Sequence, residues 1–473
     1  MSAEQTMIDY LKSNYDTFTK QAKDIWDHPQ VGLEETYAAK LLSDYLEEQG
    51  FEVERGVGQM PTAFVASWGE GKPVIGVLGE YDALPGLSQT VSPTRDPIEE
   101  GGPGHGCGHN LYGVGAMAAT LAVREAMKEA GISGTVRFYG CPAEETLVGK
   151  TFMARAGVFD DLDAAVTWHP GYANTVWSNG SSLAMNSFKV HFHGVAAHGA
   201  AVPHLGRSAL DGALLMDVGV NYMREHVEQD VRVHSVITDG GQAPNVVPPE
   251  ATIWYYVRAP KRDQVDEIYN WMLDIAKGAA LMSGTTYDVE FLTGCYEIMP
   301  NETINDVALA KMEELGGIEF DHGDMAFARD LQESIPKNLI EMDVEKILKR
   351  AAPGTTRDDI GEVLCEKVIR PSDEFMIMHG SSEVGDVSQI TPTVNLLTCC
   401  HPLGTPGHSW QTVAASGSSV GFKGMDFAAK AMALTVYELM TNEELLNEAK
   451  EEFERETGGR KYVTPLPEDA VPH

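Results

Sequence analysis

The sequence is poor in cysteine and has no long hydrophobic run. Six cysteines are spread through 473 residues without paired spacing. This usage argues against a disulfide-stabilised fold and favours free thiols in a reducing, cytoplasmic compartment. No apolar run reaches about 18 residues, so we expect no membrane-spanning helix. The first residues lack a basic segment followed by an apolar one, so we expect no secretory signal there.

Basic residues are also scarce. The chain has 35 Lys and Arg against 70 Asp and Glu, which gives a formal net charge of −35. A surface of this sign repels nucleic acid and anionic lipid, so we expect neither nucleic acid nor a membrane as a partner. An acidic substrate would need locally placed Arg or Lys side chains to overcome this field.

Length and pattern predict a large α/β domain. A single hydrophobic core stops growing at about 250–300 residues, so two domains are expected. Short buried strands alternate with helical stretches, which is typical of a largely parallel sheet with helices on both faces. We assign residues 1–185 and 299–473 to this discontinuous domain, with 318–370 as a peripheral insertion and 463–473 as a frayed tail. The expected strands lie at 74–78, 135–139, 164–168 and 394–399, and the expected helices at 5–49, 111–130 and 425–456.

Residues 186–298 have a different character. Residues 187–193 alternate polar and apolar side chains, as a strand with one wet face does. The order of expected elements through this segment is β-α-β-β-α-β, which predicts an inserted α+β domain of the ferredoxin-like sandwich type. The exposed face or edge of such a sheet commonly pairs with a second copy, so we expect a dimerisation domain.

Potential metal ligands follow the expected strands of the α/β domain. The segment Gly104-His105-Gly106-Cys107-Gly108-His109-Asn110 brings a thiolate and an imidazole close together, and both suit a transition metal such as Zn²⁺. Glu144-Glu145, His169 and His408 each come just after or at the end of an apolar run. Because sites in open α/β sheets form at the carboxyl ends of strands, these residues can meet. Taken singly, each also fits a solvated acid pair or a packed histidine.

The residue types suggest metal-assisted hydrolysis. A metal lowers the pKa of bound water toward about 7, and one carboxylate of the glutamate pair can bind the metal while the other takes the proton of the water. Asp82 is expected to accept the second N–H of a metal-binding imidazole. A structural zinc site is the alternative, but such sites are closed and four-coordinate and need no additional carboxylate.

These motifs resemble the amidohydrolase branch of the dinuclear-metal aminoacylase and carboxypeptidase family. The resemblance covers nearly the whole chain and is greatest to the subfamily formed by the B subunit of p-aminobenzoyl-glutamate hydrolase. It rests on Cys107-Gly108-His109-Asn110, Glu144-Glu145, 192–198, 241–248, 383–388 and 401–410. Asn110 stands where the wider branch has Asp.

The resemblance implies a role for each site residue. One or two divalent ions per subunit, Zn²⁺ or Mn²⁺, would be held by Cys107, His109, Glu145, His169 and His408. Glu144 would be the base, and His198 would stabilise the oxyanion in the active site of the partner protomer. Asn245 and Arg258 would bind the carboxylate of the substrate, although Asn245 also fits a turn and Arg258 a surface ion pair.

The implied reaction is hydrolysis of the amide bond between an acyl or aroyl group and an amino acid. The expected small-molecule substrate is an N-acyl amino acid, and p-aminobenzoyl-glutamate, cleaved to p-aminobenzoate and glutamate, is the preferred choice. The expected assembly is a homodimer or a complex with a paralogous partner. The alternatives are a dipeptidase of the same subfamily and a non-catalytic scaffold or regulatory protein.

Overall fold

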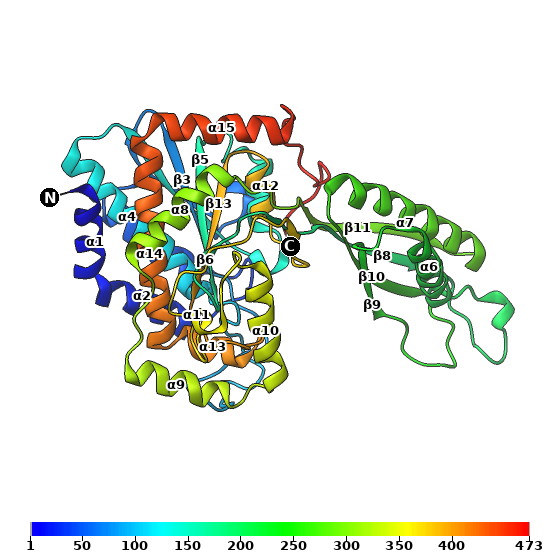
Figure 1. Cartoon of the computed structure of the whole chain (residues 1–473). Coiled ribbons are helices and arrows are strands. Elements are labelled where there is room, and N and C mark those ends of the chain that lie inside the picture. The colour runs from blue at the N-terminus through cyan, green and yellow to red at the C-terminus, as the bar shows by residue number, and fades with distance from the viewer. Residues whose placement is uncertain (1, 473) are drawn as a thin grey trace. The chain divides into compact units, whose positions relative to one another are not determined.

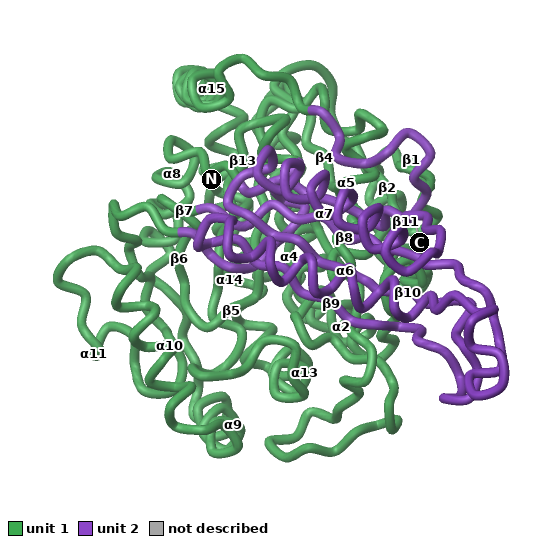
Figure 2. The backbone as a smooth tube through the Cα atoms, turned by 90° about the vertical axis from the view of Figure 1, so that its right-hand side faces the viewer, with its two compact units in different colours: residues 1–180, 299–376, 387–462 green, residues 181–298, 377–386, 463–473 purple. Residues whose placement is uncertain are grey.

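The computed structural model describes residues 2–472 and divides the chain into two compact units (Figure 2). Unit 1 contains the described residues up to Gly180, together with Met299–Met376 and Val387–Tyr462. Unit 2 contains Ser181–Ile298 and two further segments, 377–386 and the described residues from Val463. Both segments fall within the range predicted for the α/β domain. Met1 and His473, which end the predicted ranges, lie outside the described residues.

Unit 1 is built on a seven-stranded sheet with the order β1-β2-β4-β3-β5-β13-β6. Figure 1 labels β3, β5, β13 and β6 of this sheet. The four neighbouring strands β4, β3, β5 and β13 are parallel, while β1, β2 and β6 pair antiparallel at the two edges. The parallel strands end together at one edge, where the candidate site lies. The strands are β1 (Glu52–Arg55), β2 (Phe64–Glu70), β3 (Val74–Glu80), β4 (Gly134–Cys141), β5 (Ala164–Gly171), β6 (Thr175–Val176) and β13 (Thr393–Cys399).

Two long helices form the centre of the unit 1 core. α4 (His109–Ala130) and α14 (Ser419–Thr441) pack on each other and against the parallel strands. Most of their residues are buried, as expected for helices that are apolar nearly all round. The start of α4 lies so close to the sheet that a Cβ on Gly113 would be 2.8 Å from the carbonyl oxygen of Glu80. This close approach brings the first turn of α4 against the end of β3.

The remaining helices of unit 1 surround this core. Residues 318–370, predicted to be a peripheral insertion, contain three helices. The stretch predicted to be helical at 425–456 is two helices that meet at Asn442. α12 (Val384–Ser388) crosses the boundary between the units. The other helices are α1 (Ala3–Ser13), α2 (Tyr15–Asp27), α3 (Thr36–Glu48), α5 (Gly149–Arg155), α8 (Glu302–Leu315), α9 (His322–Gln332), α10 (Lys337–Arg350), α11 (Arg357–Ile360), α13 (Trp410–Ser416) and α15 (Glu443–Thr457).

Unit 2 is a four-stranded antiparallel sheet with the order β11-β8-β10-β9 and two helices. Alternate residues of β10 are buried beneath the helices, which explains the period of two seen in the sequence. The expected fold class, a mixed α/β unit with a largely parallel sheet and a separate α+β unit, is confirmed. The elements are β8 (Ala184–His193), α6 (Ala209–Met223), β9 (Arg232–Asp239), β10 (Glu250–Ala259), α7 (Arg262–Ser283) and β11 (Thr286–Cys295).

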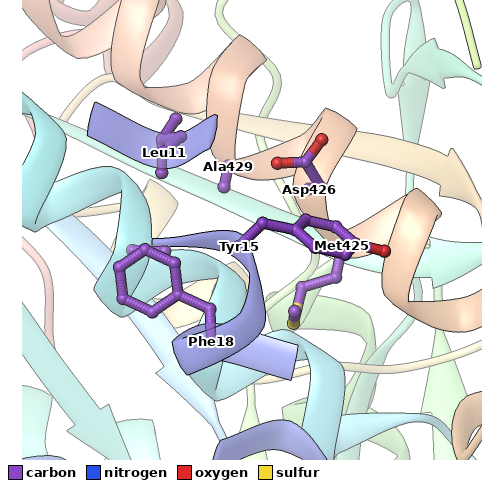
Figure 3. A pocket seen from close by; sticks show the side chains of 7 residues that line it. Leu11, Tyr15, Phe18, Met425, Asp426 and Ala429 are labelled. Carbon is purple, nitrogen blue, oxygen red and sulfur yellow. The ribbon is translucent and has the colours of Figure 1, made fainter. Parts of the chain in front are cut away.

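Other features of the structure agree with the sequence composition. All six cysteines are free, and five of them are buried. Among the described residues, no helix combines the length and apolar character needed to cross a membrane. A small apolar pocket in unit 1 is lined by side chains of α1, α2, α4 and α14, including Leu11, Phe18 and Met425 (Figure 3). None of its lining residues was singled out by the motifs.

Candidate metal centre

The predicted ligands of unit 1 come from the ends of the parallel strands. Cys107 and His109 lie at the start of α4, in the connection that follows β3. Glu144 and Glu145 form a short 3₁₀ turn after β4, and His169 lies near the end of β5. His408 follows β13 in a loop, where its backbone has a positive φ of 54°. The parallel pairing of β4, β3, β5 and β13 therefore brings four distant segments to one edge.

Asp82 fixes the orientation of His109. The Nδ1 atom of His109 lies 2.8 Å from the Asp82 Oδ1 atom, and both side chains are buried. The other Asp82 oxygen accepts the backbone N–H of Glu145 at 2.9 Å. Burial lowers the pKa of His109, but the charges of Asp82 and Cys107 outweigh burial and raise this pKa well above its usual value. With Nδ1 engaged, Nε2 is the atom that remains for a cation.

Cys107 belongs to two groups of potential ligands. In the first, ligand atoms of Cys107, His109 and His169 all lie within 4.8 Å of one another. In the second, ligand atoms of Cys107, Glu145 and His408 meet the same limit. The Sγ atom of Cys107 is 3.4 Å from the His169 Nε2 atom, and the His408 Nε2 atom is 3.3 Å from a Glu145 oxygen. One sulfur atom thus belongs to two clusters that could each hold an ion.

The anionic groups of the site are short of positive charge. Burial raises the pKa of Glu145 to about 8 and the pKa of Cys107 to about 12. Burial, followed by the charge of Glu80, raises the pKa of Glu144. Burial also lowers the pKa of His169 to about 4, which leaves its imidazole neutral and able to ligate. A divalent cation would supply the positive charge that these buried groups lack.

The residues present fit a bound divalent cation. Three buried polar atoms of the site have no hydrogen-bond partner: Glu80 Oε2, His109 Nε2 and Glu145 Oε1. Unpartnered buried polar atoms are costly, and a bound ion beside Glu80 Oε2 and His109 Nε2, which lie 3.4 Å apart, would satisfy both. The donor set of thiolate, imidazole and carboxylate suits Zn²⁺ and other first-row transition metals.

Asn110 has a structural role that a carboxylate could not take. Its side-chain nitrogen donates to the carbonyl oxygens of Ala22, at 3.2 Å, and Ser416, at 3.0 Å. An aspartate has no N–H group to donate, so the departure from the Asp of the wider branch matches the two acceptors here. Asn110 thereby connects the first turn of α4 to α2 and α13.

The other three predicted residues lie in unit 2. His198 and Asn245 are exposed and lie on adjacent segments, where the His198 segment pairs with that of Val246 and the Gly199 N–H donates to the Asn245 carbonyl. Arg258 lies elsewhere, since the part of β10 between Glu250 and Arg258 spans about 26 Å at about 3.3 Å per residue. In a single copy of unit 2, Arg258 and Asn245 are therefore far apart.

Arg258 itself has spare donor capacity. Its guanidinium lies 5.1 Å from the ring centre of Tyr256, and its buried Nε atom has no hydrogen-bond partner. No ion pair to Arg258 occurs among the described residues. This arrangement differs from the surface ion pair that the sequence left open for this residue.

Three charged residues near the site were not predicted from the sequence. Glu80 ends β3, and its ligand atom groups with those of His109 and Glu144 within 4.8 Å. Lys150, on α5, forms an ion pair with Glu80. Glu35 is fully buried and accepts the Ala143 N–H at 2.7 Å, just before the glutamate pair. None of the three belongs to a motif of potential ligands. The only feature of the sequence that marks each one is a charged residue next to a buried segment.

Comparison with known proteins agrees with the resemblance seen in the sequence. Residues 184–281, the main part of unit 2, match the M20 peptidase dimerisation domain. The chain is 41% identical over 474 residues to the B subunit of p-aminobenzoyl-glutamate hydrolase from Escherichia coli K12, covering 98% of this chain and 97% of that protein. It is 30% identical to the A subunit of the hydrolase from the same organism, over 48% of this chain and 53% of that protein.

More distant matches were found with one curated protein and one solved structure. Human Xaa-Arg dipeptidase is 28% identical, over 93% of this chain and 89% of that protein. The crystal structure of the Bacillus subtilis YXEP protein, described as a dinuclear metal-binding peptidase of the M20 family, superposes with a TM-score of 0.56. That match covers 91% of this chain and 99% of the other at 18% identity, so it concerns the fold alone. The identity to the hydrolase B subunit over nearly the whole chain and the matched dimerisation domain show that the chain belongs to the M20 family of peptidases and amidohydrolases and is a hydrolase.

Proposed function

We propose that the chain is a metal-dependent amidohydrolase that cleaves p-aminobenzoyl-glutamate to p-aminobenzoate and glutamate. The observation that carries this proposal is the meeting of Cys107, His109 and His169, and of Cys107, Glu145 and His408, within 4.8 Å. The substrate is that named for the relative with 41% identity over nearly the whole chain. The dipeptidase alternative is favoured by the similarity to Xaa-Arg dipeptidase, at a lower identity of 28%.

We assign one or two divalent ions, Zn²⁺ or Mn²⁺, to this centre, with Cys107 shared between the two ligand groups. When bound, the metal polarises the amide carbonyl and lowers the pKa of water near it. Glu144 takes the proton of the attacking water and transfers it to the leaving amine nitrogen. Its environment suits this role because burial and Glu80 raise its pKa from that of an ordinary glutamate.

His198 is proposed as the donor to the developing oxyanion. Its Nδ1 atom accepts the backbone N–H groups of Ala200, at 3.2 Å, and Ala201, at 3.1 Å. A neutral imidazole whose Nδ1 accepts carries its proton on Nε2, so the exposed Nε2 is a hydrogen-bond donor. Such a donor is worth about 3–4 kcal/mol where one has been removed from other enzymes.

Asn245 and Arg258 are proposed to bind the carboxylates of the substrate. The length of β10 between them favours a site completed by two copies, with His198 and Asn245 supplied by one and Arg258 by the other. We therefore propose a dimer through unit 2, either with a second copy or with a paralogous protein such as the A-type relative. Six free cysteines favour a reducing, cytoplasmic location.

The test compares the wild-type protein with Glu144→Gln, and uses Glu444→Gln, an exposed change on α15, as the matched control. We expect Glu144→Gln to keep its metal content, measured by elemental analysis, and to lose at least about 10²-fold in kcat with p-aminobenzoyl-glutamate. Retained activity in Glu144→Gln would show that the base is another group. Faster cleavage of Xaa-Arg dipeptides than of p-aminobenzoyl-glutamate by the wild-type enzyme would favour the alternative function.

A further inference from the structure

A buried ion pair lies beside the candidate metal centre. The Lys150 Nζ atom is 2.7 Å from the Glu80 Oε1 atom, and the two side chains are 0% and 1% exposed. The other Glu80 oxygen, Oε2, has no hydrogen-bond partner and lies 3.4 Å from the His109 Nε2 atom. Glu80 thus faces an ammonium with one oxygen and the proposed ion-binding nitrogen with the other.

The backbone holds this pair in place. Lys150 is the second residue of α5, directly after Gly149. A Cβ at Gly149 would lie 1.8 Å from the carbonyl oxygen of Pro142, so only glycine lets α5 begin this close to the end of β4. α4 also lies close to the Glu80 backbone, because a Cβ at Gly113 would lie 2.8 Å from the Glu80 carbonyl oxygen.

Burial excludes the ordinary roles of a lysine here. A side chain with no exposed surface cannot contact a substrate or a partner protein, and an unpaired ammonium in this position would be very costly. The pair is therefore an internal feature of the site. Its effect on chemistry must act through Glu80 and through the charge of Lys150.

The charges of the site make that effect clear. One ammonium, that of Lys150, stands against one thiolate and four carboxylates when all are ionised. Two divalent cations would balance the four negative charges that remain. The anionic groups are Cys107, Glu80, Asp82, Glu144 and Glu145.

We propose that Glu80 and Lys150 form a charge-setting pair that determines how tightly the centre holds its divalent cations. Lys150 binds one oxygen of Glu80, which leaves only Oε2 to face the ion beside His109. The fixed positive charge of Lys150 also weakens cation binding to a level compatible with turnover. Both are positioning residues, because neither touches the substrate. This inference rests on the proposed function, since it concerns the same metal centre.

The experiment separates the charge of Lys150 from the presence of Glu80. The metal-free wild-type protein and the variants Lys150→Met, Glu80→Gln and Glu80→Gln/Lys150→Met are titrated with Mn²⁺ alone at pH 8 by calorimetry. The wild type and Lys150→Met differ only in the Lys150 charge, and so do Glu80→Gln and the double variant. Lys450→Met is the matched control, because Lys450 pairs with Asp163 at 2.6 Å outside the site.

We expect each removal of the Lys150 charge to lower the Mn²⁺ dissociation constant by at least about tenfold, because unit charges several ångströms apart interact strongly in a buried site. Glu80→Gln should bind Mn²⁺ most weakly, and the double variant should bind it about as tightly as the wild type, since both carry the same net charge. Lys450→Met should match the wild type. The kcat of Lys150→Met should fall while its KM stays unchanged, because added negative charge at the metal reduces its power to polarise the carbonyl.

Two results would overturn the proposal. The first is an unchanged or weaker Mn²⁺ affinity when the Lys150 charge is removed in both pairs. The second applies if the single variants Glu80→Gln and Lys150→Met do not fold. It is a folded double variant that binds Mn²⁺ at least about tenfold more weakly than the wild type. Glu80 would then be a ligand in its own right. A wild-type protein that binds no Mn²⁺ or Zn²⁺ would instead refute the proposed function itself.

Discussion

Replacement of Asp82 by Asn tests how the site prepares His109 for a cation. Asp82 accepts two hydrogen bonds from groups that both carry their protons, the His109 Nδ1 at 2.8 Å and the Glu145 backbone N–H at 2.9 Å. An asparagine of the same shape has one acceptor oxygen and one donor NH₂ group, so it can satisfy only one of these two partners.

Both orientations of the new amide are unfavourable. If its oxygen keeps the bond to Glu145, its NH₂ group faces Nδ1 of His109, which must then accept and carry its proton on Nε2, where a cation would bind. If its oxygen keeps the bond to His109, its NH₂ group opposes the buried N–H of Glu145, at a cost of about 1–3 kcal/mol. We therefore expect Asp82→Asn to weaken divalent-metal binding by about 10- to 100-fold, which corresponds to about 1.4–2.7 kcal/mol.

The assay is calorimetric titration of the metal-free protein with Mn²⁺ and, separately, with Zn²⁺. Asp163→Asn is the matched control, since Asp163 also accepts a backbone N–H, that of Val74 at 2.7 Å, but lies outside the site. Asp82→Asn should show the weakened affinity and Asp163→Asn should not. A wild-type dissociation constant in a folded Asp82→Asn protein would refute the tautomer argument.

Three further predictions concern stability and metal dependence. Burial raises the pKa of Glu35 to about 7, so the folded protein binds the carboxyl proton of Glu35 more tightly than the unfolded chain does. Relative to Glu35→Gln, the free energy of unfolding of the wild type should therefore fall by about 3 kcal/mol as the pH rises from 4.5 to 7. Urea unfolding at several pH values measures this change. Gly149→Ala should destabilise the fold by about 3 kcal/mol, because its Cβ would overlap the Pro142 carbonyl, whereas Gly278→Ala, with nothing within 4 Å, should slightly stabilise α7 in the same assay. Chelation should abolish hydrolysis and lower the melting temperature, and added Mn²⁺ should restore both; a chelated protein with full activity would contradict metal dependence.

The parallel sheet of unit 1 could be predicted because its strands are buried on both faces. Each reads as a short apolar run, such as 74–78, bounded by turn residues, and this signal needs no knowledge of tertiary contacts. The antiparallel strands β1 and β2 were not predicted, since their residues are partly exposed and mixed in character. The break between α14 and α15 had a local signal that was overlooked: Asn442 caps α15 by accepting the Leu445 N–H, and two glutamates follow it.

The candidate ligands could be found because the chemistry of a metal site restricts the residue types that can serve. Cysteine and histidine at strand ends are few in this chain, so few residues qualify as ligands. Their meeting within 4.8 Å is a property of the strand order, which periodicity does not reveal. The residue types therefore indicate which side chains could bind a metal, and the sheet brings these side chains to one edge.

The supporting charges were beyond the reach of the sequence for a different reason. Seventy acidic residues are present, and nothing in the local sequence separates Glu80 or Glu35 from the solvated majority. Their distinction is that each is less than 2% exposed and has one oxygen without a partner, which only packing can produce. A ligand must have a particular chemical type, whereas a residue that sets the charge of a site needs only a charge in the right place. The sequence of such a protein thus identifies the atoms that hold an ion more readily than the buried groups that decide how tightly it is held.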